Sequence, residues 1–122
     1  MGHQFEELSS RVLAAAIDVR KALGPGFLEL NYQKAMEVAL HHRDIPFERQ
    51  KEIHVFFEGV DVGVQRLDLV ACPQIILELK AVAALADVHY AQLKSYLKAT
   101  NLHVGLLLNF NAPTLVIKRI VL

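Results

Sequence analysis

The spacing of apolar residues changes near Phe47, and this change limits the folds that the chain can adopt. Before that point apolar side chains recur at helical spacing over residues 5–23 and again over about 28–43, which predicts two amphipathic helices. The segment GPG at 24–26 ends the first helix, because glycine suits a helix C-cap and proline cannot continue the hydrogen-bond ladder. The chain therefore begins with two helices, each with one apolar face to bury.

From Phe47 onward the apolar period falls towards two, which predicts strands. The predicted elements are strands at 47–59, 60–71 and 74–82, a helix at about 84–100, and strands at 103–110 and 114–122. A meander of strands followed by a helical crossover implies a mixed sheet flanked by helices. We therefore predict an α/β fold with a central mixed sheet of about five strands, in the order ααβββαββ.

The length and charge of the chain limit its organisation and its partners. A chain of 122 residues fits a single domain, residues 1–122. Apolar residues make up 53% of it, which favours a globular fold over disorder. Thirteen basic and thirteen acidic residues give no net charge, so any binding of a polyanion must be local. Near-neutral charge with high apolar content also favours self-association, and a homo-oligomer is a reasonable expectation.

Cysteine content and apolar run length indicate a cytoplasmic protein. Cys72 is the single cysteine, so no intrachain disulfide can form. The N-terminal sequence MGHQFEEL lacks the basic start and apolar run of a secretory signal. Every apolar stretch is too short to span a bilayer. We therefore expect no membrane association.

Three charged residues, Asp68, Glu78 and Lys80, interrupt two otherwise apolar predicted strands. Because side chains alternate between the faces of a strand, Glu78 and Lys80 share one face, and Arg66, Asp68 and Val70 share a face of the preceding strand. An odd-length turn between the two strands places Asp68 opposite Glu78, with their Cβ atoms roughly 5 Å apart.

Two carboxylates at that separation repel each other, which raises one pKa unless a cation lies between them. Hard ions such as Mg²⁺ and Mn²⁺ prefer carboxylates, carbonyls and water, and Asp68, Glu78 and the Leu79 carbonyl offer such ligands. Lys80 could position an attacking water or balance charge on a phosphate. The alternative is that both acids form ion pairs with Arg66 and Lys80 on a solvated face. Because so short a motif recurs by chance, the motif alone favours this alternative.

Asp68 followed by Glu78-Leu79-Lys80 on adjacent strands, after an acidic helix, resembles the pattern of the PD-(D/E)XK nuclease superfamily. The sequence is still more similar to the small bacterial and archaeal GxxExxY family, whose motif corresponds to GFLELNY at 26–32. Further segments similar to that family are RLDL at 66–69, ELKAV at 78–82, HYAQLKSYLK at 89–98 and GLLLNF at 105–110. The resemblance covers nearly the whole chain.

This resemblance implies a restriction-endonuclease-like core, a Mg²⁺ or Mn²⁺ cofactor, and hydrolysis of phosphodiester bonds in nucleic acid, DNA more than RNA. The implied site residues are Asp68, Glu78 and Glu29 with the Leu79 carbonyl as metal ligands, Lys80 as the catalytic lysine, and Gln92 with Tyr96 near it.

Several of these residues also have simpler structural interpretations. Glu29 could be a first-turn carboxylate favoured by the helix dipole. Tyr32 lies one turn after it and could either orient Glu29 or pack in the core. Gln92 could face solvent. Lys94 and Lys98 share one face of the late helix, where they could bind phosphate or form an ordinary solvated surface.

Two other function classes are compatible with the sequence. One is a non-catalytic module that keeps the fold and binds nucleic acid or a protein partner, which zero net charge and small size favour. The other is a homo-oligomeric scaffold, in which apolar residues such as Phe56 and Phe57 drive association.

Overall fold

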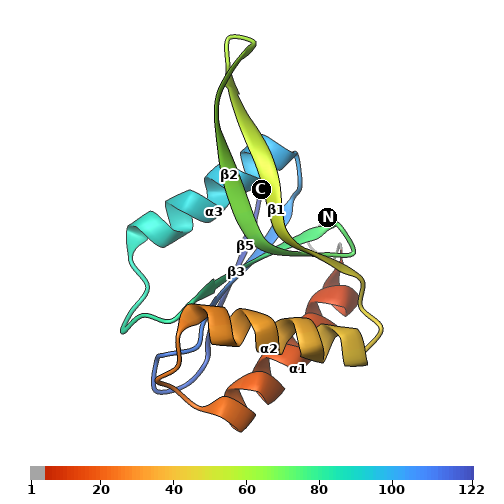
Figure 1. Ribbon diagram of the computed structural model, residues 1–122, viewed down its shortest axis with the longest axis vertical. Helices are drawn as coiled ribbons and strands as arrows, with labels where there is room; N and C mark the ends of the chain where they lie inside the picture. Colours follow the sequence, from red (N-terminus) through yellow and green to blue (C-terminus); the bar gives the residue numbers. More distant parts are fainter. Residues whose placement is uncertain (1–4) are drawn as a thin grey trace.

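The computed structural model describes residues 5–122, which form three helices around a five-stranded mixed sheet (Figure 1). Residues 1–4 lie outside the described residues. They belong to the N-terminal segment MGHQFEEL, in which we predicted no secretory signal. The elements are α1 (Glu6–Leu23), α2 (Glu29–His42), β1 (Phe47–Phe57), β2 (Val60–Ala71), β3 (Ile75–Lys80), α3 (Asp87–Thr100), β4 (Val104–Asn109) and β5 (Val116–Val121). The predicted α/β fold and the order ααβββαββ are confirmed.

The strands lie in the sheet in their sequence order, β1-β2-β3-β4-β5. All neighbouring pairs are antiparallel except β3 and β4, which are parallel. A parallel pair needs a crossover connection, because the chain must return to the end from which the first strand began. Helix α3 provides that crossover, so its position over the sheet is tied to the central strands.

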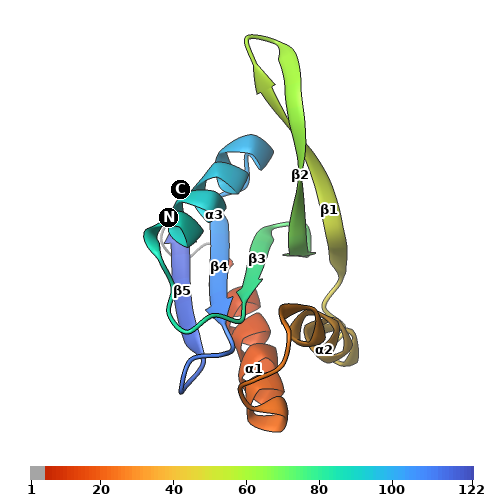
Figure 2. The same cartoon turned by 60° about the vertical axis from the view of Figure 1, so that its left-hand side comes forward.

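Helices cover both faces of the central strands (Figures 1 and 2). One core cluster joins α1 and α2 to side chains such as Leu77 and Leu79, and a second joins α3 to Ile76 and Leu107. Strands covered on both faces are apolar at nearly every position rather than at alternate ones. The sequences IILEL and VGLLLN in β3 and β4 follow this rule. Among the described residues, no helix is long and apolar enough to cross a membrane.

Helix α3 begins at Asp87, whereas we predicted a start at about Ala84. The ring nitrogen Nδ1 of His89 accepts a hydrogen bond from the Ala86 N–H at 3.0 Å. This bond satisfies one of the backbone donors that precede the first turn of a helix. Alanine favours helix wherever it stands, so the preceding alanines made the predicted helix too long.

The β1–β2 hairpin projects beyond the rest of the sheet (Figures 1 and 2). Its two-residue turn, Glu58 and Gly59, has φ values of 50° and 79°, as in the type I′ turns that suit twisted hairpins. The register of the two strands shifts between Val55 and Phe56. Such an irregularity increases the local twist of a strand pair.

Strand β2 also changes the face that it presents to α3. Leu69 packs in the cluster of α1 and α2, whereas Val70 and Leu67 both pack in the cluster of α3. Strict alternation would place Leu67 with Leu69, so the prediction that Arg66 shares a face with Val70 is wrong. The change coincides with Gln50 of β1, which lies between the pairs Arg49–Leu69 and Lys51–Leu67 and has a φ of 49° in place of an extended backbone.

The close approach of α3 to β4 depends on Gly105. A Cβ atom at this position would lie 2.8 to 3.0 Å from three carbon atoms of the Leu93 side chain. The nearest is closer than Cβ contacts normally come, so the Leu93 side chain must shift, and it is fully buried. Because Gln92 precedes Leu93, this contact also sets the height of Gln92 above the sheet.

We predict that Gly105→Ala lowers the free energy of unfolding by about 1–3 kcal/mol, the usual effect of overpacking. In a Leu93→Ala background the same substitution should have a much smaller effect, because the clashing atoms are gone. Urea denaturation of the four proteins in this double-mutant cycle measures both quantities. Equal effects of Gly105→Ala in the two backgrounds would contradict the steric explanation.

Candidate active site

The candidate site begins where strands β2 and β3 separate. The backbone ladder between them ends at the pair Leu69 and Leu77, and the next facing positions are Asp68 and Glu78. There the side chains replace the ladder: the Asp68 N–H donates to Oε1 of Glu78 at 3.3 Å, and the Leu79 N–H donates to Oδ2 of Asp68 at 2.9 Å. The two carboxylates therefore lie together, as the register predicted.

Both carboxylates are withdrawn from water. Glu78 is 4% exposed and Asp68 is partly buried. Among the described residues, neither forms an ion pair with Arg66 or Lys80. A solvated face of cross-strand ion pairs is therefore not the arrangement of these acids. They form a carboxylate pair between β2 and β3, on the face of the sheet that α3 covers.

The environment favours the protonated form of the pair. The pKa of Glu78 is raised to about 8, first by burial and then by the charges of Asp68 and Glu29, against the lowering effects of the hydrogen bond from Asp68 and the charge of Lys80. Burial also raises the pKa of Asp68, although the Leu79 N–H and Lys80 oppose this shift. Near neutral pH the metal-free pair therefore holds a proton.

Lys80 lies at the end of β3 and faces α3. Its Nζ donates a hydrogen bond to Oε1 of Gln92 at 3.2 Å, and its carbonyl accepts one from the Phe110 N–H at 2.9 Å. The first contact orients the ammonium group and the second fixes the strand end. Gln92 is thus partly buried and bonded rather than solvent-facing. The Leu79 carbonyl points towards β2, on the side of its N–H and of the carboxylates.

Tyr96 lies one turn after Gln92, on the same side of α3, and is 6% exposed. Burial raises the pKa of its hydroxyl, and the negative charges of Glu78 and Asp68 add to the rise. The hydroxyl therefore stays neutral and within electrostatic reach of the carboxylates. The exposed lysines of the same helix, Lys94 and Lys98, are at the surface.

Glu29 is the first residue of α2 and is exposed to solvent. Its pKa is raised by partial desolvation and then by the charge of Asp68, while Lys80 lowers it. These effects place Glu29 within electrostatic reach of the pair. However, no group of three or more His, Cys, Asp or Glu side chains within residues 5–122 is arranged to hold a metal ion. Glu29 therefore lies at the rim of the site and does not complete a ligand set with the pair.

Tyr32 is fully buried and holds the turn that precedes Glu29. Its hydroxyl donates to the Gly24 carbonyl at 2.6 Å and accepts from the Phe27 N–H at 3.2 Å. Its ring stacks on Phe110 with centroids 4.8 Å apart. Of the two interpretations of Tyr32, core packing is thus observed directly, and the same residue also fixes the segment that leads to Glu29.

Two asparagines that our sequence analysis did not single out support the loops around the site. Asn109 is fully buried; its side chain accepts from the Val82 N–H at 3.1 Å and donates to the Val82 carbonyl at 2.9 Å. Oδ1 of Asn111 accepts from the Gly26 N–H at 3.0 Å. These bonds tie the segment after Lys80 and the turn before α2 to the end of β4. The sequence signal that could have identified Asn109 was its position as a polar residue at the end of an otherwise apolar strand.

Gln33 is a second buried polar residue that our sequence analysis missed, although it lies one turn after Glu29. It is 5% exposed, donates to Oε2 of Glu37 at 3.2 Å and accepts from Nε2 of Gln50 at 2.8 Å. Gln50 stands opposite Asp68 in the register of β1 and β2. Gln33 thus links α2 to the twisted point of the hairpin.

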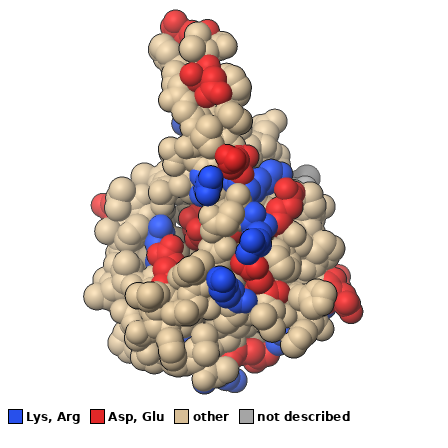
Figure 3. All heavy atoms as spheres, in the orientation of Figure 1, with Lys and Arg blue, Asp and Glu red and all other residues tan. Residues whose placement is uncertain are grey.

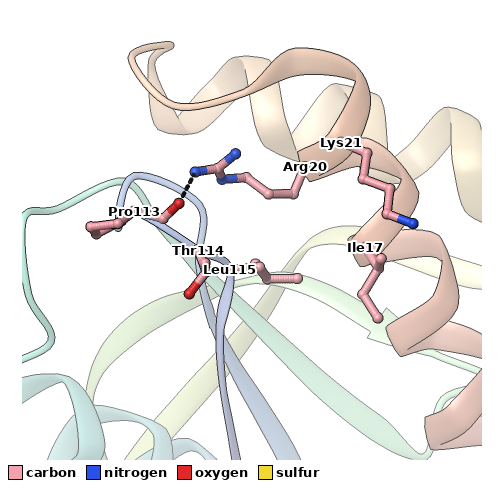
Figure 4. Close-up of a pocket in the computed structure, with 6 residues that line it drawn as sticks. All are labelled: Ile17, Arg20, Lys21, Pro113, Thr114 and Leu115. Atoms are coloured by element: carbon pink, nitrogen blue, oxygen red, sulfur yellow. Dashed lines mark hydrogen bonds between the residues drawn. The ribbon is translucent and has the colours of Figure 1, made fainter.

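Figure 4 shows a pocket of about 280 Å³ between α1 and the loop that joins β4 and β5. Arg20 donates from Nη2 to the carbonyls of Ala112 and Pro113 at 2.8 and 3.0 Å. The lining residues are Ile17, Arg20, Lys21, Pro113, Thr114 and Leu115. None is a candidate site residue, so this pocket is separate from the carboxylate pair.

The donor set at the end of β3 fits a hard divalent cation. Asp68 and Glu78 supply facing carboxylates, and the Leu79 carbonyl points to the same side. A cation there would offset the burial and the repulsion that together keep a proton on the pair. With two carboxylates, the remaining ligands would be water or a substrate oxygen. Together the fold and this site define an α/β protein of the restriction-endonuclease-like class.

A comparison with known families agrees with this class. A family model described as the PD-(D/E)XK nuclease superfamily matches residues 6–120, and the chain belongs to this superfamily. Its members typically use divalent metal ions. No curated protein and no solved structure matches the chain at the significance that we required.

The raised pKa of Glu78 predicts that the metal-free protein loses stability as the pH rises. Between about 4.5 and 8 the folded state binds more protons than the unfolded state, so the free energy of unfolding falls over this window. The loss should reach a few kcal/mol, since each tenfold shift of a protonation equilibrium corresponds to about 1.4 kcal/mol. Urea denaturation in EDTA at several pH values measures it, and Glu78→Gln should flatten the slope. Stability that rises with pH in this window would contradict the buried-pair interpretation.

We also predict that Tyr32→Phe lowers the free energy of unfolding by about 1–3 kcal/mol, because it leaves two backbone groups without their partner. Hydrogen exchange of the Phe27 amide should speed up, since its acceptor is removed. Tyr90→Phe is the matched control, because Tyr90 is a partly buried tyrosine that packs against the cluster of α3, on the other face of the sheet from Tyr32. Unchanged protection of Phe27 would show that the hydroxyl does not hold this turn.

Proposed function

We propose that this protein is a metal-dependent nuclease that hydrolyses phosphodiester bonds of nucleic acid, DNA more than RNA. The observation that carries the proposal is the buried pair of Asp68 and Glu78 beside Lys80, in a chain of the PD-(D/E)XK nuclease superfamily. A like-charge pair in the interior costs stability unless something positive binds it. Such a cost indicates a functional use of the site.

The site residues have distinct roles in this proposal. Asp68, Glu78 and the Leu79 carbonyl hold Mg²⁺ or Mn²⁺, which when bound would polarise the scissile phosphate and lower the pKa of a water. Lys80 keeps donors free after its bond to Gln92 and presents them to the water or to a phosphate oxygen. Gln92 acts as a positioning residue for Lys80.

Glu29 acts from the rim in this scheme. At the first turn of α2 its carboxylate is favoured by the helix dipole, and its exposure lets it move towards the site when substrate binds. It would then serve as a further metal ligand or accept a proton from a water. The raised pKa of its carboxyl suits the second role, because it lies nearer to the working pH than that of a free glutamate.

Within the superfamily we infer membership of the GxxExxY branch. The three named residues of that motif are Gly26, Glu29 and Tyr32. Gly26 has a φ of 105°, a conformation that other residues rarely adopt, and Tyr32 holds the same turn through its hydroxyl. The motif thus has a physical meaning in this chain, since the glycine and the tyrosine fix the turn that presents the glutamate. We also infer a cytoplasmic location, from the single cysteine.

A non-catalytic module that binds nucleic acid or a protein partner is the second candidate function. One observation favours it: the described residues contain no group of three side chains ready to hold a metal ion. In such a module the carboxylate pair would remain protonated, and the protein would bind its partner without turnover. Metal binding and cleavage therefore separate the two candidates.

We predict that Mn²⁺ binds the protein at one site that requires the carboxylate pair. Isothermal titration should show binding that Asp68→Ala/Glu78→Ala weakens at least a hundredfold, because both anionic ligands are lost. Near pH 7 binding should release about one proton, since the pair gives up its proton to the metal. Titration in buffers of different ionisation enthalpy measures that release.

The matched control is Glu48→Ala/Glu52→Ala, which removes two exposed acids of β1. It should bind Mn²⁺ like the native protein and cleave labelled DNA at the native rate. Native binding in Asp68→Ala/Glu78→Ala would refute the metal site. Metal binding without cleavage of any single-stranded, duplex or branched DNA or RNA would favour the non-catalytic module.

A further inference from the structure

The β1–β2 hairpin projects beyond the rest of the protein (Figure 1), and several of its apolar side chains are exposed. The exposed fractions are 63% for Phe56, 65% for Phe57, 62% for Val60, 57% for Val62 and 45% for Val64. Together they expose roughly 500 Å² of largely apolar surface, which is divided between the two faces of the hairpin, because Phe56 pairs with Asp61 and Phe57 with Val60. Such a surface indicates an interface.

A groove of about 440 Å³ lies between this hairpin and α3. Ser95 and Ala99 line it from the helix, one turn apart, and both side chains are small and exposed. Small side chains allow another element to approach the helix closely. Lys98 also lines the groove, and Lys94 lies one turn before it on the exposed side of α3.

The end of the hairpin carries the opposite charge. Glu58 lies in the turn, and Asp61 follows it, with its pKa lowered by hydrogen bonds from the Gly63 N–H and from His54. In Figure 3 the tip of the projection is red and tan, while most blue groups lie lower, over the body. An acidic, apolar tip is unsuited to a phosphate backbone. It complements a small-residue groove flanked by lysines, which this chain itself carries.

We propose that two copies of this chain form a symmetric dimer in which the hairpin of each copy occupies the groove between hairpin and α3 of the other. Phe56 and Phe57 are then covered, and Glu58 and Asp61 lie beside Lys94 and Lys98 of the second copy. Because a twofold axis repeats every contact, one hairpin and one groove per chain suffice. Covering both hairpins and the surfaces that they meet buries roughly 1,600–2,000 Å², the range of stable interfaces.

This dimer does not depend on the proposed nuclease function. Lys98 lies in the C-terminal half of α3, and Gln92, which contacts Lys80, lies in its N-terminal half. The interface uses exposed side chains of the helix, whereas Gln92 and Tyr96, on the side of the carboxylate pair, are partly or fully buried. A variant that does not cleave nucleic acid can still be tested for dimerisation, and a monomeric variant can still be tested for cleavage.

Sedimentation equilibrium over a range of protein concentrations tests the proposal. The native chain should dimerise, and Phe56→Ser/Phe57→Ser should raise the dissociation constant at least tenfold. The matched control is Leu28→Ser/Leu30→Ser, which removes two apolar side chains that are 75% and 55% exposed elsewhere. It should change the constant less than twofold. A native monomer up to roughly 100 μM, or an equal effect of the two double variants, would overturn the proposal.

Reversal of charge tests the pairing itself. Glu58→Lys and Lys98→Glu should each raise the dissociation constant severalfold, because each places like charges together at both copies of the contact. The chain that carries both substitutions should return to within about threefold of the native value. Both positions are exposed, and circular dichroism confirms that each variant is folded. A double variant that dimerises no better than the worse single variant would refute the reciprocal contact.

Discussion

The burial of Glu78 in a strand covered on both faces is the constraint on which the candidate site depends. Strand β3 has α1 and α2 on one side and α3 on the other, so the Glu78 carboxylate has little access to bulk water. The protein compensates by ending the β2–β3 ladder at this point, where the backbone N–H of Asp68 bonds to Glu78 and that of Leu79 bonds to Asp68. These two hydrogen bonds satisfy the oxygens only in part, and they add no positive charge. The remaining repulsion makes the pair responsive to a proton or a cation.

The surrounding packing holds the other site groups at fixed positions relative to this pair. Leu93 rests on Gly105, which sets the depth of α3 and thereby the reach of Gln92 to Lys80. At the other side, Tyr32 and Asn111 bind the turn before α2. Most of these contacts join segments far apart in the sequence, so the site depends on the complete fold. A substitution that loosens the packing can therefore disturb the geometry of the site without touching a ligand.

The sequence predicted the elements well because each has a clear apolar period and its ends carry strong signals, such as the GPG segment and the turn at Glu58. The meeting of Asp68 and Glu78 followed from register alone. The roles of Asn109 and Gln33 could not be predicted, because a polar residue in a helix or at a strand end looks the same whether it is solvated or buried. The reversal of faces between Leu67 and Leu69 was also missed. It coincides with the positive φ of Gln50 in the neighbouring strand, an irregularity that a strict period of two does not represent.

Helix α3 contributes to two different surfaces, the carboxylate site and the groove beside the hairpin, and different residues of the helix serve each. Towards its N-terminus the helix turns Gln92 to the site, and Tyr96 follows one turn later near the carboxylates. On the exposed side of the helix, Ser95, Lys98 and Ala99 line the groove beside the hairpin. The helix is held to the sheet between these surfaces by Leu93 and Leu97, which are buried. A rigid element fixed at its centre presents both surfaces in a constant relation, so a dimer formed through the grooves would hold its two carboxylate sites at a defined separation.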